Sequence, residues 1–449
     1  MDAETYLTEG YGVRLAIESK PKGWVKFDSL ASASAPPRIK QVLVSPEYGT
    51  PYLNTSQVFD SWPQPRKWLA LSKTVRGTER LVNEGTILVM ASATVGRAIV
   101  ATKAHEGAIV SHHFLRVTPR QPDYGGWVYA FLRSPQGLSM IRGSQYASLI
   151  RHVEPRHLAT LPVPLISRDL AAEFTERVRS IVDCRNRATA LRVAAEEKFA
   201  AALPELAGPA FNAETGYSVS AGMVTRGRRR LEGAYYAPHV ISILSRFQHW
   251  EPLRALTQRV WWGKRFKRYF GDAGIPYMSA DDVFTMNPYH TERILVQPGD
   301  GHEELFVRKG WLIMACSGQT YGLNGSAMIV TEAHENVVFS HDMIRIQPNP
   351  DMRPGYLLTA LTHPTLGRPL LLRIAYGMSI PHLDPDDVAA FPIVRLGTRV
   401  ENTIAELAEA SASEQARAEV MERELATDAG SVVSEFMLRG PSAAVAELG

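Results

Sequence analysis

Residues 49–53, with the sequence GTPYL, indicate how this 449-residue chain is organised, because a similar run occurs a second time. They return at residues 274–278 as GIPYM, after an interval of 274 − 49 = 225 positions. An apolar pair, Val58-Phe59 or Val283-Phe284, follows each copy. A strand-like run that recurs at so long an interval indicates an internal duplication, and such repeats govern the interpretation of every local motif.

Two later blocks recur at nearly the same interval. The first returns after 340 − 111 = 229 positions, with Thr102, Ala104, His105, Glu106, Ser111, His112, Arg116 and Pro119 matched by Thr331, Ala333, His334, Glu335, Ser340, His341, Arg345 and Pro348. The second returns after 380 − 150 = 230 positions, with Tyr146, Ile150, His152, Glu154, Pro155 and Pro162 matched by Tyr376, Ile380, His382, Asp384, Pro385 and Pro392. The interval drifts by only a few residues, so the chain is interpreted as a tandem duplication, repeat 1 followed by repeat 2.

Each repeat has the same order of expected elements. Short β-branched or apolar runs bounded by Gly, Pro and Ser come first and predict strands, at residues 86–90, 108–110, 311–314 and 337–339. Short helices are expected next, around residues 127–132 and 356–361.

A long helix is expected to close each repeat. Apolar residues recur at three- and four-residue steps from Phe174 to Phe199 and again from Val400 to Leu425. The apolar stripe is narrow, rich in Ala and flanked by Glu and Arg, a pattern that favours one helix pairing with another. Some thirty residues at about 1.5 Å each span roughly 45–55 Å, longer than one domain face needs. The alternative is that each helix packs on its own globular domain.

Composition predicts a soluble cytoplasmic protein. Hydrophobic residues make up 45% of the chain and charged residues 21%, an ordinary globular balance, and the net charge is only +3. Cys184 and Cys316 match no metal-ligand or disulfide spacing. No signal peptide is expected at the acidic N-terminus, and no apolar run reaches the roughly 18 residues that cross a bilayer.

Together these features resemble the DNA specificity subunit of type I restriction–modification systems. The resemblance is carried by the GxPY strand of each repeat, the later runs at 85–89 (GTILV) and 310–314 (GWLIM), the block ending in 161–164 (LPVP) or 391–393 (FPI), and the long helix. It implies an α+β fold with two β-rich target-recognition domains separated by two long helices that form an antiparallel coiled coil. The chain departs from the family where a Glu-Gln pair commonly opens the first helix, since Ser167 to Leu170 (SRDL) stand there. Ser167 can still cap that helix.

The resemblance also implies boundaries and partners. We expect a first recognition domain at 1–166, a first spacer helix at 167–203, a linker at 204–230, a second recognition domain at 231–396, a second spacer helix at 397–438 and a tail at 439–449. The expected function is recognition of a bipartite, asymmetric DNA target in phage defence. The expected partners are double-stranded DNA, two DNA adenine methyltransferase subunits and a translocating nuclease subunit.

Residues 252–271 are the strongest candidate DNA contact. They contain six basic and no acidic residues, interleaved with Trp261, Trp262, Phe266, Tyr269 and Phe270, as suits a surface that grips phosphates. The alternative is a solvated basic loop whose aromatic side chains belong to the core. The counterpart in repeat 1, residues 30–46, has only two basic residues, which predicts an asymmetric target. The expected contacts are Arg259, Lys264, Arg265, Lys267 and Arg268 in repeat 2 and Arg38 and Lys40 in repeat 1.

Other polar residues are expected either to contact DNA bases or to support the fold. Asn54, Ser56 and Gln57, with Ser279 and Asp281, follow the GxPY strands and are candidates to face bases. The pairs Ser111-His112 and Ser340-His341 occur in both repeats, so a structural role is favoured for them. The run at 226–230 (RGRRR) lies in the linker, and a phosphate contact and an idle solvated run are equally open.

The chain is not expected to be an enzyme. It has no methyltransferase catalytic loop of the Asn-Pro-Pro-Tyr type and no P-loop, so no catalytic residue, cofactor or metal site is predicted. Residues 318–325 (GQTYGLNG) are expected to form a Gly-rich hairpin rather than a phosphate cradle. A second class stays open, a protein-only scaffold or adaptor of a related anti-phage complex, and the salt dependence of DNA binding would separate the two.

Overall fold

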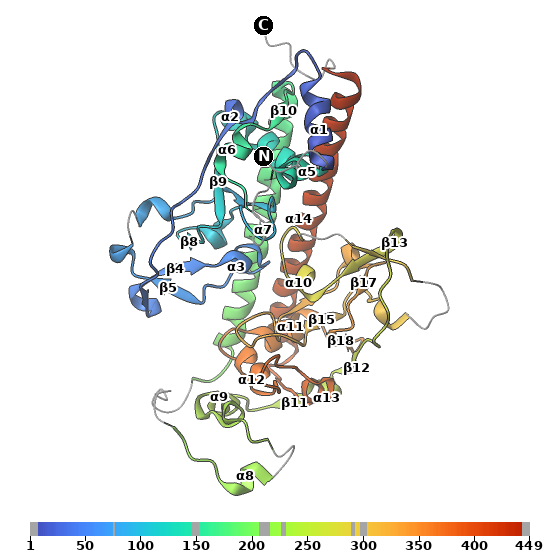
Figure 1. Cartoon of the computed structure of the whole chain (residues 1–449). Coiled ribbons are helices and arrows are strands. Elements are labelled where there is room, and N and C mark those ends of the chain that lie inside the picture. Colours follow the sequence, from blue (N-terminus) through green and yellow to red (C-terminus); the bar gives the residue numbers. More distant parts are fainter. Residues whose placement is uncertain are drawn as a thin grey trace. The chain divides into compact units, whose positions relative to one another are not determined.

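The computed structural model describes residues 8–74, 77–144, 152–205, 216–225, 230–288, 292–296 and 303–441. The chain forms two compact units. Unit 1 contains Met1–Arg187, Thr285–Tyr289 and Gln415–Gly449, and unit 2 contains Ala188–Phe284 and His290–Glu414. Each unit combines helices with small sheets, as the α+β prediction requires (Figure 1).

Unit 1 is built on two four-stranded sheets and a strand pair. The first sheet is antiparallel, in the order β2 (Ala31–Ser34), β9 (Phe114–Pro119), β6 (Ile87–Met90) and β7 (Ala98–Val100). The second has the order β3 (Leu43–Val44), β5 (Lys67–Leu69), β4 (Thr50–Leu53) and β8 (Ile109–Val110). The pair joins β1 (Trp24–Lys26) to β10 (Pro162–Pro164).

Unit 2 repeats this topology, except that within the described residues its second sheet has three strands where that of unit 1 has four. Its antiparallel sheet has the order β12 (Thr257–Trp262), β18 (Met343–Pro348), β15 (Leu312–Ala315) and β16 (Ala327–Ile329). A second sheet joins β14 (Arg293–Ile294), β13 (Phe270–Met278) and β17 (Val338–Phe339), and β11 (Trp250–Pro252) pairs with β19 (Pro392–Val394).

The register is also repeated. The GxPY strand of unit 1 runs parallel to β8 with Tyr52 opposite Ile109, and in unit 2 Tyr277 lies opposite Val338. These are the partners that the 225- and 229-residue intervals require, so the structure confirms the duplication. Tyr146 and Ile150, which belong to the third repeated block, lie outside the described residues.

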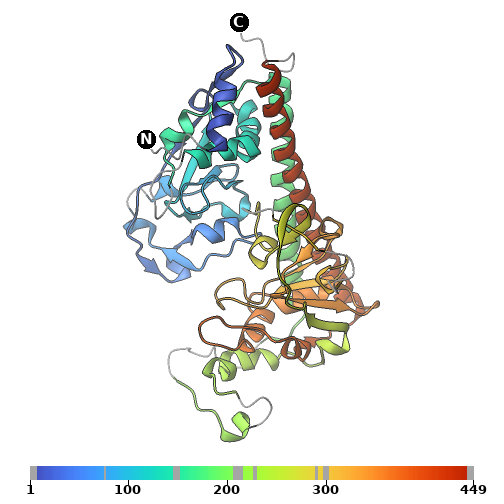
Figure 2. The same ribbon diagram turned by 45° about the vertical axis from the view of Figure 1, so that its right-hand side comes forward.

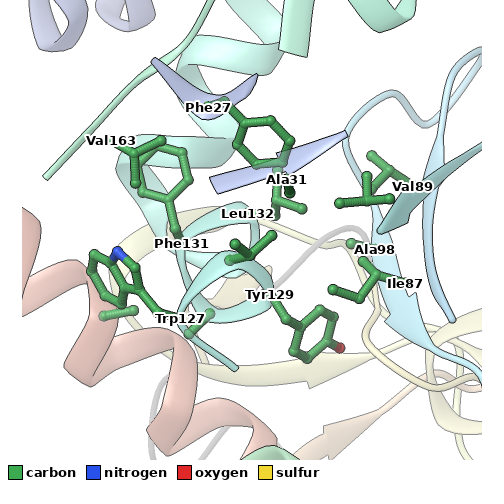
Figure 3. Close-up of a cluster of buried hydrophobic side chains, with 14 of the residues drawn as sticks. Phe27, Ala31, Ile87, Val89, Ala98, Trp127, Tyr129, Phe131, Leu132 and Val163 are labelled. Carbon is green, nitrogen blue, oxygen red and sulfur yellow. The ribbon is translucent and has the colours of Figure 1, made fainter. Parts of the chain in front are cut away.

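The central strand of each first sheet is apolar on both faces because both faces are covered. In β6, Ile87 and Val89 enter one core while Leu88 and Met90 enter another. In β15, Leu312 and Met314 alternate in the same way with Ile313 and Ala315. The larger core of unit 1 also receives six buried side chains of α4 (Gly125–Arg133), among them Trp127, Tyr129, Phe131 and Leu132 (Figure 3).

Two of the remaining helices are long and are described below, and the others are short. They are α1 (Glu9–Glu18), α2 (Phe27–Leu30), α3 (Thr55–Phe59), α5 (Pro135–Gly143), α6 (Pro155–Ala159), α8 (Ala221–Thr225), α9 (Pro238–Leu244), α10 (Ala280–Val283), α11 (Pro354–Thr362), α12 (Gly367–Arg373) and α13 (Pro385–Ala389). The helices expected around 127–132 and 356–361 are therefore confirmed as α4 and α11. No helix in the described part of the chain has the length and apolar character that a membrane span needs.

The two long helices are α7 (Arg168–Ala201) and α14 (Thr398–Arg439), which lie side by side in both views (Figures 1 and 2). Ser167 caps α7 as expected, since its Oγ accepts the backbone N–H of Leu170 at 3.3 Å. Within unit 1, Arg177 pairs with Asp428 and Arg185 with Glu422, so the helices run antiparallel.

Both interpretations of the long helices hold. They pair with each other, and within unit 2 the Ser411 hydroxyl on α14 donates to the Ala188 carbonyl on α7 at 2.7 Å. Each also packs on the sheet-bearing part of its unit, with ring centroids 5.2 Å apart for Trp127 and Phe174 and 6.0 Å apart for Phe199 and Tyr356. The helix pair is thus part of the hydrophobic core of both units.

A short segment of repeat 2 belongs to unit 1. Met286 enters a unit 1 core cluster, and its backbone N–H donates to the Phe59 carbonyl at 2.7 Å. Arg97 donates to the carbonyls of Met286 and Asn287 at 2.7 and 2.6 Å. Asn287 is buried with a positive φ of 52°, and its side-chain amide donates to Ala98, Tyr129 and Glu422. No local sequence pattern indicates this contact.

Two glycines at matching positions set how closely the short helices approach the long ones. A Cβ at Gly126 would collide with the backbone of α7 at Phe174 and Thr175, and a Cβ at Gly355 would collide with the backbone of α14 at Ala405. Gly126 also donates its backbone N–H to the Thr175 hydroxyl at 3.0 Å. The close approach therefore depends on the absence of a side chain at either glycine.

Replacing either glycine should destabilise the chain despite the helix propensity of alanine. We expect Gly126→Ala and Gly355→Ala to lower the free energy of unfolding by about 1–3 kcal/mol, the usual cost of overpacking. Gly125→Ala is the matched control, because its Cβ would lie 3.4 Å from Pro119, an ordinary contact. Urea unfolding of the three variants checks this. Equal midpoints for Gly126→Ala and Gly125→Ala would contradict the packing argument.

Candidate DNA interface

The basic stretch of repeat 2 centres on an exposed loop between β12 and β13, which we call the basic loop (residues 263–269). Lys264, Arg265, Lys267 and Arg268 are all exposed on it. In the described part of the chain no ion pair involves any of the four. Their charges are therefore available to an anionic partner.

The aromatic side chains of this stretch divide between core and surface. Trp261 is buried against Trp311 in an edge-to-face contact with ring centroids 5.2 Å apart, and Phe266 packs against a small core cluster that includes Tyr277 and Ile294. Trp262, Tyr269 and Phe270 are exposed. The alternative that these aromatic side chains belong to the core is thus correct for Trp261 and Phe266. It is wrong for the three exposed ones.

Two cations of the basic loop contact tyrosine side chains. Arg268 donates from Nη1 to the Tyr277 hydroxyl at 3.2 Å, and Lys267 Nζ lies 5.1 Å from the centre of the Tyr269 ring. Arg259 differs, because it is paired with Glu304 at 3.0 Å and stacks over Trp261. A DNA phosphate would have to compete with Glu304 for Arg259, whereas the loop cations have no such competitor.

The corresponding loop of unit 1 carries Arg38 and Lys40, both exposed. Arg38 donates from Nε to His112 Nε2 at 3.1 Å, a contact that sequence analysis did not foresee. The two units therefore have the same loop in the same place on the sheet with different charge.

The polar residues after the GxPY strands lie at helix N-termini. Asn54 Oδ1 accepts the backbone N–H of Gln57 at 2.9 Å, and the Gln57 side chain accepts in return from the Asn54 N–H, a capping box for α3. Ser279 and Asp282 form the same box for α10. Gln57 is also only 2% exposed, so a contact from it to a base would require the cap to open. Ser56 and Asp281 occupy the matching exposed position of each helix.

Several residues common to both repeats support the fold. Arg345 is fully buried and donates to the carbonyls of Met343 and Phe339 at 2.8 and 3.0 Å. Burial lowers the pKa of its guanidinium to about 10. The matching Arg116 donates to the carbonyls of Glu79 and Leu81. The histidine matched by His334, His105, is buried in a capping box with Thr102, and burial lowers its pKa to about 4.

The structure also describes part of the basic run at 226–230 and all of the Gly-rich run at 318–325. Arg230 is buried and donates to the carbonyls of Ile374 and Ala375 at the end of α12, so it stabilises unit 2, while 226–229 lie outside the described residues. The run at 318–325 connects the antiparallel strands β15 and β16, as the hairpin prediction states. The described residues contain no cluster of three or more potential metal-ligating side chains.

Three solved structures resemble the chain along nearly its whole length, each at 14% sequence identity. The type I restriction–modification S subunit from M. genitalium matches 92% of this chain and 95% of its own, with a TM-score of 0.34. The HsdS subunit from Thermoanaerobacter tengcongensis matches 94% and 98%, with a TM-score of 0.28. A structure that addresses complex assembly and conformational transition of the type I R-M system matches 94% and 100%, also at 0.28.

No family model and no curated protein matches the chain. All three TM-scores lie below 0.5, so these likenesses do not assign the chain to a family.

If the basic loop contacts phosphates, its cations should set the salt dependence of DNA binding. We expect the triple variant Arg265→Ala, Lys267→Ala, Arg268→Ala to weaken binding to duplex DNA. The slope of log K against log salt should fall by about one for each lost phosphate contact. Titrations at graded salt measure this. The control variant removes three exposed arginines from α14 (Arg399, Arg417 and Arg423). Equal slopes in the triple variant and the wild type would exclude the basic loop from the interface.

Proposed function

We propose that the chain is the DNA-specificity subunit of a type I restriction–modification system. In this proposal it recognises a bipartite, asymmetric target in double-stranded DNA and directs methyltransferase subunits to it. The observation that carries the proposal is one fold present twice, with matching strand order and register, that bears different exposed charge at the same loop.

The shared residues and the variable residues have different roles in this proposal. The buried arginines and capping histidines that the repeats share maintain the fold. The loops after β2 and β12 differ, with two cations in one and four in the other. Two identical surfaces would suit a symmetric target, so unlike surfaces favour an asymmetric one.

The expected boundaries assign the parts their roles. Residues 1–166 and 231–396 would be the recognition domains, and 167–203 and 397–438 the spacer helices. Arg38, Lys40 and Ser56 would contact DNA in the first domain, and Lys264, Arg265, Lys267, Arg268 and Asp281 in the second. Arg259, Asn54, Gln57 and Ser279 remain proposed contacts, each of which would first have to leave its present partner.

Methylation would take place in partner subunits in the cytoplasm. Because the sequence contains two copies of one fold, two adenine methyltransferase subunits are the proposed complement, one for each repeat, and a translocating nuclease subunit would join for cleavage. A methyltransferase must rotate its target adenine out of the duplex, and the specificity subunit would hold the flanking sequence meanwhile.

The chain alone should therefore bind DNA without modifying it. We expect no methyl transfer when the purified chain is incubated with duplex DNA and S-adenosylmethionine, and transfer when methyltransferase subunits are added. Methylation by the pure chain would contradict the proposal. DNA binding without any dependence on salt, or no binding at all, would instead favour a protein-only scaffold.

The length of the helix pair should set the unread spacer of the target. Seven residues inserted between Arg187 and Ala188, and seven between Glu414 and Gln415, would add about 10 Å to both helices. They would turn each helix face by only about 20°. At roughly 3.4 Å per base pair the spacer should grow by about three base pairs, with both half-sites unchanged.

Target selection from a randomised library, with the methyltransferase complex, measures the spacer. The control inserts the same seven residues between Ser218 and Val219, which lie outside both long helices. An unchanged spacer with full affinity would show that the helices do not set it, and a changed half-site would show that the domain boundaries are wrong.

A further inference from the structure

Three histidines of unit 1, to which the proposed function gives no role, form a cluster with Arg38. His112 and His113 lie in the turn between β8 and β9, with ring centroids 4.0 Å apart. Arg38 reaches this turn from the loop after β2. His152 is paired with Ser92 in an isolated β-bridge, and its charge acts on both neighbouring imidazoles. We call these four residues the histidine cluster.

The hydrogen bonds of the cluster fix one protonation state. The guanidinium of Arg38 can only donate, so His112 Nε2, 3.1 Å away, must accept and is unprotonated. His113 Nδ1 lies 2.7 Å from the Ser92 hydroxyl. A proton on His112 Nε2 would break the contact with Arg38 and leave two cationic donors side by side.

The surroundings of the cluster oppose that protonation while no anion is bound. Burial is the first cause that lowers the pKa of His112 and of His113 below the ordinary histidine value. The other charges that act on His112 are those of His113, Arg38 and His152, and those that act on His113 are His152 and Arg38. None of these groups is acidic, so no carboxylate of the described residues is among the charges that act on either imidazole.

The same place in unit 2 does have a carboxylate. His341 matches His112, but the next residue is Asp342 where unit 1 has His113, and His341 Nε2 lies 3.2 Å from Asp342 Oδ1. The fold thus accepts either a histidine or an aspartate at this position. A residue that changes charge between two copies of one scaffold is suited to recognition and is not needed for folding.

We propose that the histidine cluster binds a phosphate of the DNA backbone and takes up a proton from solvent as it does so. The proton joins His112 Nε2, the hydrogen bond from Arg38 breaks, and both side chains then donate to phosphate oxygens. This inference rests on the proposed DNA-binding function and assigns repeat 1 a contact that titrates.

The direction of the pH dependence follows from linkage. A bound phosphate raises the histidine pKa above its value in the free protein. Affinity therefore increases as the pH falls through the pKa of the complex, and it levels off below the pKa of the free protein. Because burial lowers the pKa of His112 in the free protein below the ordinary value of 6.5, the affinity should continue to rise until the pH is below about 6.5. Each proton taken up changes the dissociation constant by at most about tenfold per pH unit.

The test measures binding of the full chain to a random-sequence DNA duplex between about pH 6 and about pH 8, at constant ionic strength. Two variants address the cluster: His112→Gln, which removes the accepting nitrogen, and His113→Asp, which installs the residue that unit 2 has at this place. His249→Gln, at an exposed position of unit 2, is the matched control. Urea unfolding verifies that each variant is folded. The variant that replaces Arg265, Lys267 and Arg268 serves as a second control.

The wild type and the His249→Gln control should bind more tightly as the pH falls, and the two cluster variants should lose most of that dependence. Calorimetry in two buffers of different ionisation enthalpy should show net proton uptake by the wild type and the His249→Gln control, and little or none by the two cluster variants. The basic-loop variant should have a lower salt slope and an unchanged pH dependence. DNA binding with the same pH dependence in the wild type and both cluster variants would overturn the inference alone. Failure of the wild type to bind duplex at any pH would overturn the proposed function.

Discussion

The pairing of α7 with α14 is the constraint on which the rest of the structure depends. Neither helix has an apolar face broad enough to be stable alone, and long helices in proteins owe most of their stability to such packing. Within unit 1 the seam includes the buried pair of Arg185 and Glu422, and Tyr129 donates to that same carboxylate. Removal of one partner from such a pair typically costs about 3–5 kcal/mol, because the other charge stays buried. The core of each unit is assembled on this seam.

The close approach of a short helix to a long one explains why a glycine stands at one position of each repeat. Gly126 and Gly355 occupy the same position in the two repeats, and each lets a short helix contact the backbone of a long one. The sheets then need only cover the outer face of α4 or α11. Duplication of such a unit preserves its packing while the loops after β2 and β12 vary in charge. The scaffold and the recognition surface are thereby separated within one short length of chain.

The repeats, the long helices and the exposed basic loop could be predicted from the sequence because each has a periodic or compositional signal. The roles of Asn54, Gln57 and Ser279 could not, because a capping side chain and a base-reading side chain have the same composition and differ only in turn geometry. The contact of Arg38 with His112 joins residues 74 positions apart, which no local pattern reveals. Residues 285–288 pack in unit 1 through Asn287, whose positive φ is not apparent from its neighbours in sequence.

That segment limits how the gene could be recombined. Exchange of one recognition domain between related proteins would be the simplest way to acquire a new target. An incoming second recognition domain, however, must bring an amide at position 287 that donates to Ala98 and Tyr129 of repeat 1 and to Glu422 of α14. It must also offer two backbone carbonyls to Arg97. Successful hybrids should therefore inherit these residues together, and the crossover points that evolution tolerates are restricted accordingly.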